Sequence, residues 1–183
     1  MLQNEILPGD VLLFYPSSLI GHIVAWATDS PYCHAAMYVA NDEVAELREF
    51  FGGRILSISS YADDTIDVFR ADCPIPVKIE AVLNMRSLMS ERYSFLHGIA
   101  AWMRRCIPKR VRRLKWVRKW FCSESDHLGY NCSQAISKAY RESRFDLCQK
   151  IPDWATTPGD LARKKRLRFV GRLDNVIDIE LLE

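Results

Sequence analysis

The stretch that decides the fold is His34-Ala-Ala-Met-Tyr-Val-Ala-Asn-Asp-Glu-Val-Ala-Glu46. Two largely apolar runs flank Asn41-Asp42, a pattern typical of a hairpin with a two-residue turn. It predicts strands over residues 34–40 and 43–49. His34 opens the first strand and Glu46 lies on the second, so a base and a carboxylate come from neighbouring strands.

The register of this hairpin decides which carboxylate can reach the histidine. A regular two-residue turn pairs Met37 with Glu46 and His34 with Glu49, which leaves Glu46 three positions, roughly 10 Å along the strand, from His34. A β-bulge or a strong twist would close that gap. Glu46 is the first choice for the group that orients His34, and Glu49 is the alternative. A solvated strand carboxylate without a function is a third explanation for either residue.

A thiol follows in the stretch Tyr130-Asn131-Cys132-Ser133-Gln134-Ala135-Ile136. Asn131 is a good N-cap residue, and the spacing of the apolar residues after it predicts a helix over 132–140. The unpaired N–H groups at the start of a helix lower the pKa of a nearby thiol, which makes Cys132 a candidate nucleophile. The alternative is a small buried residue on the apolar side of that helix.

Cys122 is the competing thiol, because Phe121-Cys122-Ser123-Glu124 has a similar order of an aromatic residue, Cys, Ser and a polar residue. The residues that follow it, Ser125-Asp126-His127-Leu128-Gly129, would break a helix almost at once, so we favour Cys132. His34 is favoured as the base, since the other histidines lack a carboxylate-bearing strand nearby. Those histidines are His22, His97 and His127.

The rest of the chain predicts an α+β domain, in which strands and helices are segregated. Strands are predicted over 10–15, 54–57, 65–69, 167–170 and 176–181. Helices are predicted over 18–28, 77–93 and 95–106, with a short helical turn at 157–160. A chain of 183 residues, 49% of them hydrophobic and 26% charged, has the size of one globular domain, so we expect a single domain over residues 1–183.

Several classes of protein are disfavoured by the composition. No stretch approaches eighteen apolar residues, so no membrane-spanning helix is expected, and no signal peptide is visible. The six cysteines form no C-x-x-C pair, which argues against a structural zinc site, and we expect neither a metal nor a cofactor. Free thiols in a reducing compartment suit such a chain, so we expect a cytoplasmic protein.

The stretch from His34 to Glu46 resembles the His-x-x-x-Tyr signature of the NlpC/P60 superfamily, with a polar residue twelve positions after the histidine. Three further motifs extend the likeness to the circularly permuted, YiiX/YebB-like branch, which is related to lecithin retinol acyltransferase. They are Pro8-Gly9-Asp10-Val11, Tyr130-Asn131-Cys132-Ser133 and Thr157-Pro158-Gly159-Asp160. The resemblance spans roughly residues 8–171. Two features depart from it: Ala36 replaces a frequent glycine, and the stretch 103–127 is longer and more basic.

This resemblance implies a papain-like fold, in which a small antiparallel sheet or half-barrel packs on helices that include the one with the thiol. It also implies Cys132 as the nucleophile, His34 as the general base and Glu46 as the residue that orients the base. The order of the three in the chain is His, Glu and then Cys, which is the permuted version of the papain-like layout.

A basic helical insert is predicted at about residues 102–121. The segment has nine positive residues and no acidic one, so the rest of a chain of net charge +2 carries −7. Three tryptophans interleave with these charges, a composition typical of a helix on an anionic membrane surface. A solvated face with inward-packed tryptophans is the alternative, and nucleic acid is the weaker option because no recognition motif accompanies the charge. The positive residues are Arg104, Arg105, Lys109, Arg110, Arg112, Arg113, Lys115, Arg118 and Lys119.

The resemblance implies a cysteine amidase or peptidase that acts on a peptide or isopeptide-like bond through an acyl-enzyme. Two alternatives remain open: a lipid-directed thiol acyltransferase or esterase, and a lipid-binding relative without catalysis. An apolar pocket would favour the lipid alternatives, and a narrow polar groove would favour a peptide. The residues expected to line such a pocket are Phe14, Ile20, Ile23 and Trp26.

Overall fold

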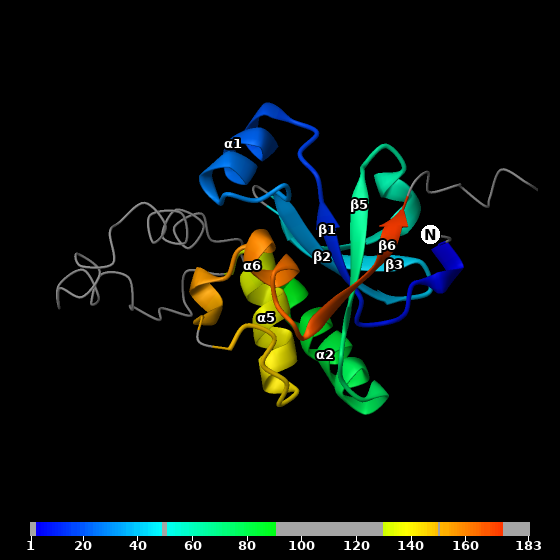
Figure 1. Ribbon diagram of the computed structural model, residues 1–183. Coiled ribbons are helices and arrows are strands. Elements are labelled where there is room, and N and C mark those ends of the chain that lie inside the picture. Colours follow the sequence, from blue (N-terminus) through cyan, green and yellow to red (C-terminus); the bar gives the residue numbers. More distant parts are fainter. Residues whose placement is uncertain (1–2, 49–50, 91–129, 150, 174–183) are drawn as a thin grey trace, which may run out of the picture.

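The centre of the molecule is an antiparallel sheet with the strand order β4-β3-β2-β1-β5-β6 (Figure 1). The computed structural model describes residues 3–48, 51–90, 130–149 and 151–173. Within these residues the strands are β1 (Val11–Phe14), β2 (His34–Ala40), β3 (Glu43–Arg48), β4 (Gly52–Ser57), β5 (Ile66–Ala71) and β6 (Leu167–Leu173).

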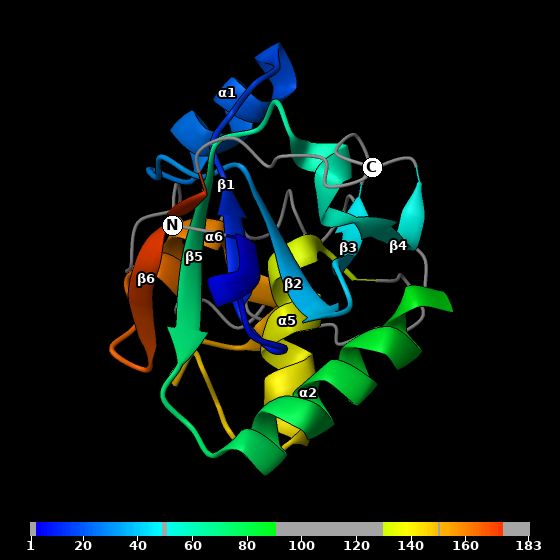
Figure 2. The ribbon, with the colours of Figure 1, turned by 90° about the vertical axis from the view of Figure 1, so that its right-hand side faces the viewer.

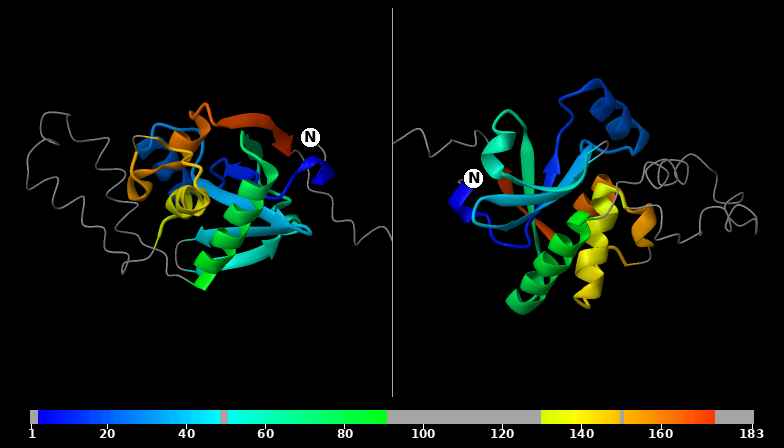
Figure 3. Two further views of the ribbon diagram at one scale, coloured as in Figure 1. Left: turned by 90° about the horizontal axis from the view of Figure 1, so that it is seen from below. Right: turned by 180° about the vertical axis from the view of Figure 1, so that it is seen from behind.

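Four α-helices accompany the sheet in the described part of the chain: α1 (Leu19–Ala27), α2 (Ile75–Ser87), α5 (Cys132–Glu142) and α6 (Pro158–Ala162). Helices α2 and α5 lie side by side (Figure 2 and the right-hand view of Figure 3), and the Asn84 side chain on α2 donates to the Ala139 carbonyl oxygen on α5 at 3.2 Å. Short 3-10 turns occur at Gln3–Glu5, Ile58–Tyr61, Leu88–Ser90 and Asp153–Ala155.

Both faces of the sheet are covered, which explains why the central strands are apolar at nearly every position. One core lies between the sheet and helices α2 and α5, where residues such as Leu13 and Met37 meet Met85 and Ile136. A second core on the other face contains Leu12, Phe14 and Val44, together with Ile58 and Tyr61 from the turn that follows β4. Strand β1, with all four residues buried, contributes to both cores.

The structure confirms the α+β prediction and most of its elements. The predicted hairpin has its turn at Asn41 and Asp42, whose φ angles of 50° and 59° are the left-handed values that a tight hairpin turn requires. The predicted helix over 18–28 is α1, with Ser18 as its N-cap, and the predicted helix over 132–140 is α5.

Two elements differ most from the predicted ranges. The helix expected over 77–93 begins at Ile75, where Pro76 in the first turn has a backbone suited to a helix start. It ends at Ser87, and a 3-10 turn follows. Strand β6 continues to Leu173, beyond the predicted 167–170, because it pairs with β5 along its whole length. The expected elements at 95–106 and 176–181, and the basic insert at 102–121, lie outside the described residues.

Candidate active site

A β-bulge in the hairpin brings Glu46 to His34. The observed pairs are Met37 with Ala45 and Tyr38 with Val44, and then Ala40 with Glu43, so one extra residue on β2 lies between Tyr38 and Ala40. The predicted pairing of Met37 with Glu46 is therefore wrong by one residue. Because side chains alternate between the faces of a strand, this shift moves Glu46 to the face of His34. The Nε2 atom of His34 lies 2.5 Å from Oε2 of Glu46.

Glu46 is fully buried and has a second partner on its other side. Arg54 pairs with it directly across β3 and β4, and its Nε and Nη2 atoms lie 2.6 and 2.5 Å from Oε1 of Glu46. Burial alone would raise the pKa of Glu46, but the hydrogen bonds and charges of His34 and Arg54 lower it to about 2. Glu46 is therefore a carboxylate at any physiological pH.

Cys132 is the first residue of α5, and the cap of that helix holds it in place. The Asn131 side chain accepts a hydrogen bond from the Gln134 backbone N–H at 2.8 Å, and the Gln134 side chain accepts from the Asn131 N–H at 3.4 Å. This reciprocal capping box stabilises the first turn, whose N–H groups carry the positive end of the helix dipole. The Cys132 sulfur is thereby placed at the electropositive end of α5.

The imidazole of His34 lies between the thiol and the carboxylate. On its other side the ring lies close enough to the Cys132 sulfur for each group to shift the pKa of the other, and the Ser133 hydroxyl lies 3.8 Å from the same sulfur. Since Nε2 faces Glu46, the nitrogen left for the sulfur is Nδ1. The His34 ring also packs on Phe14, with 5.4 Å between the ring centroids. The structure thus brings together all three residues named from the sequence.

The electrostatics of this trio favour a charged pair of sulfur and imidazole. Burial would lower the pKa of His34, but the neighbouring Cys132 and Glu46 raise it to about 10. Burial would raise the pKa of the Cys132 thiol, but the charge and hydrogen bond of His34 lower it. By contrast, burial raises the pKa of Cys148 to about 11 and also raises that of Cys73. In such a pair the thiolate can attack a carbonyl carbon, and the imidazolium can protonate the leaving group.

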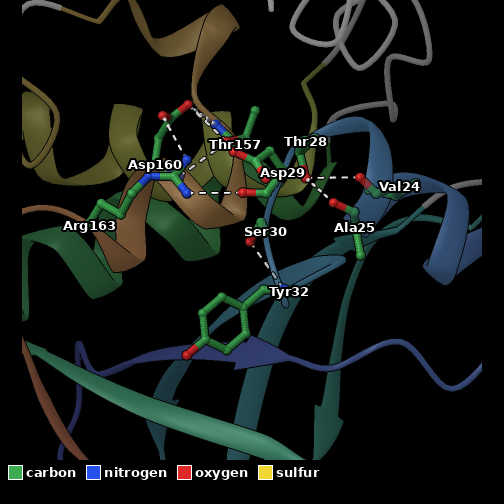
Figure 4. Close-up of polar contacts among 9 residues, drawn as sticks. All are labelled: Val24, Ala25, Thr28, Asp29, Ser30, Tyr32, Thr157, Asp160 and Arg163. Carbon is green, nitrogen blue, oxygen red and sulfur yellow. Dashed lines mark hydrogen bonds and ion pairs between the residues drawn. The ribbon is translucent and has the colours of Figure 1, made fainter.

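The segment that leads into β2 is anchored to the turn at Thr157–Asp160. Arg163 donates to the Asp29 carbonyl oxygen at 3.2 Å, while Asp160 bonds the Thr157 hydroxyl at 2.8 Å (Figure 4). A Cβ atom on Gly159 would lie 2.6 Å from the Ser30 side chain, so glycine alone permits this close approach. The segment 28–33 therefore rests on α6 immediately before His34.

The remaining candidates are placed differently. His22 is exposed on α1. Glu49, His97, Cys122 and His127 lie outside the described residues. Arg54 was missed as a site residue, although one signal pointed to it: it is a cation on the strand after Glu46. Tyr61 was also missed; burial and the nearby charge of Glu46 raise its pKa.

No helix in the described part of the chain is both long enough and apolar enough to cross a bilayer. The sequence matches no protein-family model, and no curated protein is similar to it in sequence.

The structure is similar to a crystal structure of YiiX from Escherichia coli O157:H7, described as a metalloprotein and as DUF1105. The TM-score is 0.60 and the sequence identity 12%, and the alignment covers 91% of this chain and 97% of YiiX. At this identity the likeness concerns the fold. YiiX has an NlpC/P60-like fold, and this chain shares its α+β architecture.

Proposed function

We propose that the protein is a thiol hydrolase that cleaves an amide bond, of the peptide or isopeptide-like kind, through an acyl-enzyme on Cys132. The observation that carries this proposal is the position of the His34 imidazole, which contacts the Cys132 sulfur on one side and the Glu46 carboxylate on the other. The His-Glu-Cys order along the chain agrees with a circularly permuted papain-like layout, related to lecithin retinol acyltransferase, which is part of the same proposal.

The proposed reaction has two steps. The Cys132 thiolate attacks the substrate carbonyl carbon, N–H groups in the first turn of α5 stabilise the oxyanion, and the His34 imidazolium gives its proton to the leaving amine. His34, now neutral, then removes a proton from water, which attacks the thioester. The acid leaves, the sulfur departs as a thiolate, and His34 keeps the proton, so the starting pair is restored.

Glu46 acts on His34 rather than on the substrate. Its carboxylate accepts from Nε2–H and so fixes the tautomer that leaves Nδ1 facing the sulfur. The same charge stabilises the imidazolium that forms the pair with the thiolate.

A lipid-directed acyltransferase or esterase is the second candidate, and one observation favours it. Helix α1 exposes large apolar side chains, among them Leu19 at 78% and Trp26 at 79%, and none of its residues is an Asp, Glu, Lys or Arg. Phe14 is buried, while Ile20 and Ile23 are exposed on α1 beside Trp26. A non-catalytic lipid-binding relative would use the same surface without turnover.

The metalloprotein character of YiiX does not carry over to this trio. The two oxygens of Glu46 face the His34 ring and the Arg54 guanidinium, and a cation at this carboxylate would meet the positive charge of Arg54. Within the described residues, no group of three or more His, Cys, Asp or Glu side chains is arranged to hold a metal ion. The residues of this trio therefore do not fit a metal, and no step of the proposed reaction uses one.

The cellular setting is also a proposal. Among the described residues, Cys73, Cys132 and Cys148 are free thiols, which suits a reducing compartment such as the cytoplasm. An anionic membrane surface is the proposed partner of the basic segment 102–121.

Alkylation at graded pH tests the assignment of the nucleophile. The intact protein is treated with iodoacetamide, and each cysteine is quantified by peptide mass spectrometry. At about pH 6 we expect Cys132 to react at least about tenfold faster than Cys148, because its thiolate is stabilised by His34. The His34→Ala variant should lose this advantage.

An acyl-enzyme test follows from the same assignment. Incubation with p-nitrophenyl acetate should leave an acetyl group on Cys132 in the wild type and in Cys148→Ala, and none in Cys132→Ala. Preferential modification of Cys122 at low pH, or an acetyl adduct that persists in Cys132→Ala, would rule out Cys132 as the nucleophile.

A further inference from the structure

The carboxylate of Glu46 is shared between two cationic side chains from the two neighbouring strands. His34 on β2 contacts Oε2, while Arg54 on β4 contacts Oε1 through two nitrogens, Nε at 2.6 Å and Nη2 at 2.5 Å. Arg48 is the next cation, with its Nη1 atom 3.9 Å from the same oxygen. Arg54 therefore holds the side of Glu46 that faces away from the histidine.

In the proposed reaction, Arg54 would balance the charge of Glu46 whenever His34 is neutral. His34 is positive while it is paired with the thiolate and neutral after it has protonated the leaving group. In the neutral stage Glu46, which is fully buried, would be left without a counter-charge unless another cation stayed beside it. Arg54 keeps its charge throughout, since a guanidinium does not lose its proton in proteins.

The short distance between His34 and Glu46 makes this charge important. Across a hydrogen bond of 2.5 Å, a proton moves to the carboxylate when the pKa of that carboxylate approaches the pKa of the imidazole. Arg54 is among the groups that lower the pKa of Glu46 to about 2 while the pKa of His34 lies at about 10. The Nε2 proton consequently stays on the imidazole, so His34 remains positive until its Nδ1 proton passes to the leaving group.

Arg54 is itself held in position. Its guanidinium lies over the Phe51 ring, 4.9 Å from the centroid, and its side chain is 27% exposed. The preceding residue, Gly53, lies against the backbone of Met89, where a Cβ atom would come within 2.3 Å of the Met89 carbonyl oxygen. The backbone beside Arg54 is thus packed against the 3-10 turn that follows α2. The guanidinium itself lies between the Phe51 ring and the Glu46 carboxylate.

We propose that Arg54 is a positioning residue of the candidate site: it keeps Glu46 ionised and aimed at His34 through every stage of the reaction. This inference rests on the proposed function. It predicts separate effects for the charge of Arg54 and for its forked geometry, because lysine can supply the first but cannot place two N–H groups on one oxygen.

The test compares Arg54→Gln, Arg54→Lys and the control Arg48→Gln in the full chain. In Arg54→Gln, Glu46 would be held less firmly against His34, so the imidazolium would stabilise the Cys132 thiolate less. The pH at which iodoacetamide labels this thiol half-maximally should therefore rise by about one unit. Arg54→Lys should restore that pH. With p-nitrophenyl acetate, both Arg54 variants should lower kcat about tenfold with KM unchanged, as expected when the partner of an orienting group is removed. Arg48→Gln should change neither quantity by more than about twofold.

Three outcomes would overturn the inference. An unchanged labelling profile and kcat in Arg54→Gln would mean that Arg54 is structural at most, and thermal unfolding would then report its contribution to stability. Equal shifts in Arg54→Gln and Arg48→Gln would indicate general electrostatics rather than a positioning contact. A wild-type kcat in Arg54→Lys would show that the forked geometry of the Arg54 guanidinium is not needed.

Failure of the proposed function would look different. If Cys132 is not the reactive thiol in the wild type, labelling and turnover no longer report on the site, and an NMR titration of the Glu46 carboxyl carbon becomes the readout. The pKa of Glu46 should still rise from about 2 in Arg54→Gln if Arg54 keeps it ionised. An unchanged pKa of Glu46 would overturn the inference in that case too.

Discussion

At the scale of single residues, Cys132 and, after it, Glu46 raise the pKa of His34 and so set the pH window in which the candidate pair exists. His34 has its pKa raised from the ordinary 6.5 to about 10, so its imidazolium persists through neutral pH and is lost only as the pH rises through about 10. Cys132 has its pKa lowered, so the thiolate is present at pH values where a free thiol is still protonated. The pair therefore spans neutral pH.

Replacement of Glu46 by glutamine should lower the upper pH limit at which the His34 imidazolium exists. The amide oxygen of Glu46→Gln can still accept from Nε2–H, but its charge is gone, so the pKa of His34 should fall by about one unit or more. NMR titration of the His34 ring protons measures this directly. Glu43→Gln is the matched control, since Glu43 lies on the same strand and pairs with Arg86 instead. A pKa of His34 that stays the same in Glu46→Gln would show that the 2.5 Å contact does not govern the imidazole.

At the scale of elements, the start of α5 positions the sulfur and the bulge in β2 positions the carboxylate. The capping box of Asn131 and Gln134 determines where α5 begins, and hence where Cys132 points. Helix α1 has a comparable cap, in which the Ser18 hydroxyl accepts from the Gly21 N–H at 3.1 Å. The two caps form a matched pair for an experiment.

Asn131→Ala and Ser18→Ala should each lower the free energy of unfolding by about 1 kcal/mol, as is usual for loss of an N-cap. Only Asn131→Ala should also slow the alkylation of Cys132 at pH 6, because only this cap fixes the turn that carries the thiol. Denaturant unfolding and iodoacetamide labelling measure the two effects. Equal labelling rates in the two variants would contradict a role for the cap in placing the sulfur.

At the scale of the whole molecule, the site depends on contacts between segments far apart in the chain. The segment 28–33, which leads into His34, rests on α6, more than a hundred residues later (Figure 4). The contact is close because residue 159 is glycine. Strand β6, which follows α6, joins the far edge of the same sheet and holds α6 in this position.

Gly159→Ala should therefore lower the free energy of unfolding by about 1–3 kcal/mol, the usual cost of an added group in a packed site. The new Cβ atom would collide with the Cβ and Oγ atoms of Ser30. In a Ser30→Gly background those atoms are absent, so the same substitution should cost clearly less. Thermal unfolding of the four proteins completes the double-mutant cycle, and equal costs in both backgrounds would show that Ser30 is not the limiting contact.

Local patterns in the sequence were sufficient for the elements near the site. The turn at Asn41-Asp42, the caps at Ser18 and Asn131 and the apolar spacing of the helices act over a few residues, so they can be recognised without knowledge of the fold. They predicted the hairpin, α1 and α5, and the resemblance carried by their motifs pointed to the fold that the chain shares with YiiX. The catalytic roles of Cys132, His34 and Glu46 stay predictions.

Only the tertiary structure decided how these parts meet. The local pattern predicted a regular hairpin that leaves Glu46 three positions from His34, with a bulge or a strong twist to close the gap. The structure shows a bulge, and its place between Tyr38 and Ala40 could not be predicted because it depends on how β2 packs between β1 and β3. The contact of Arg54 with Glu46 and that of Cys132 with His34 likewise join strands and helices through the sheet register and the packing of the core. Long-range contacts of this kind follow from the energy of the whole fold, whereas caps and turns follow from their own residues.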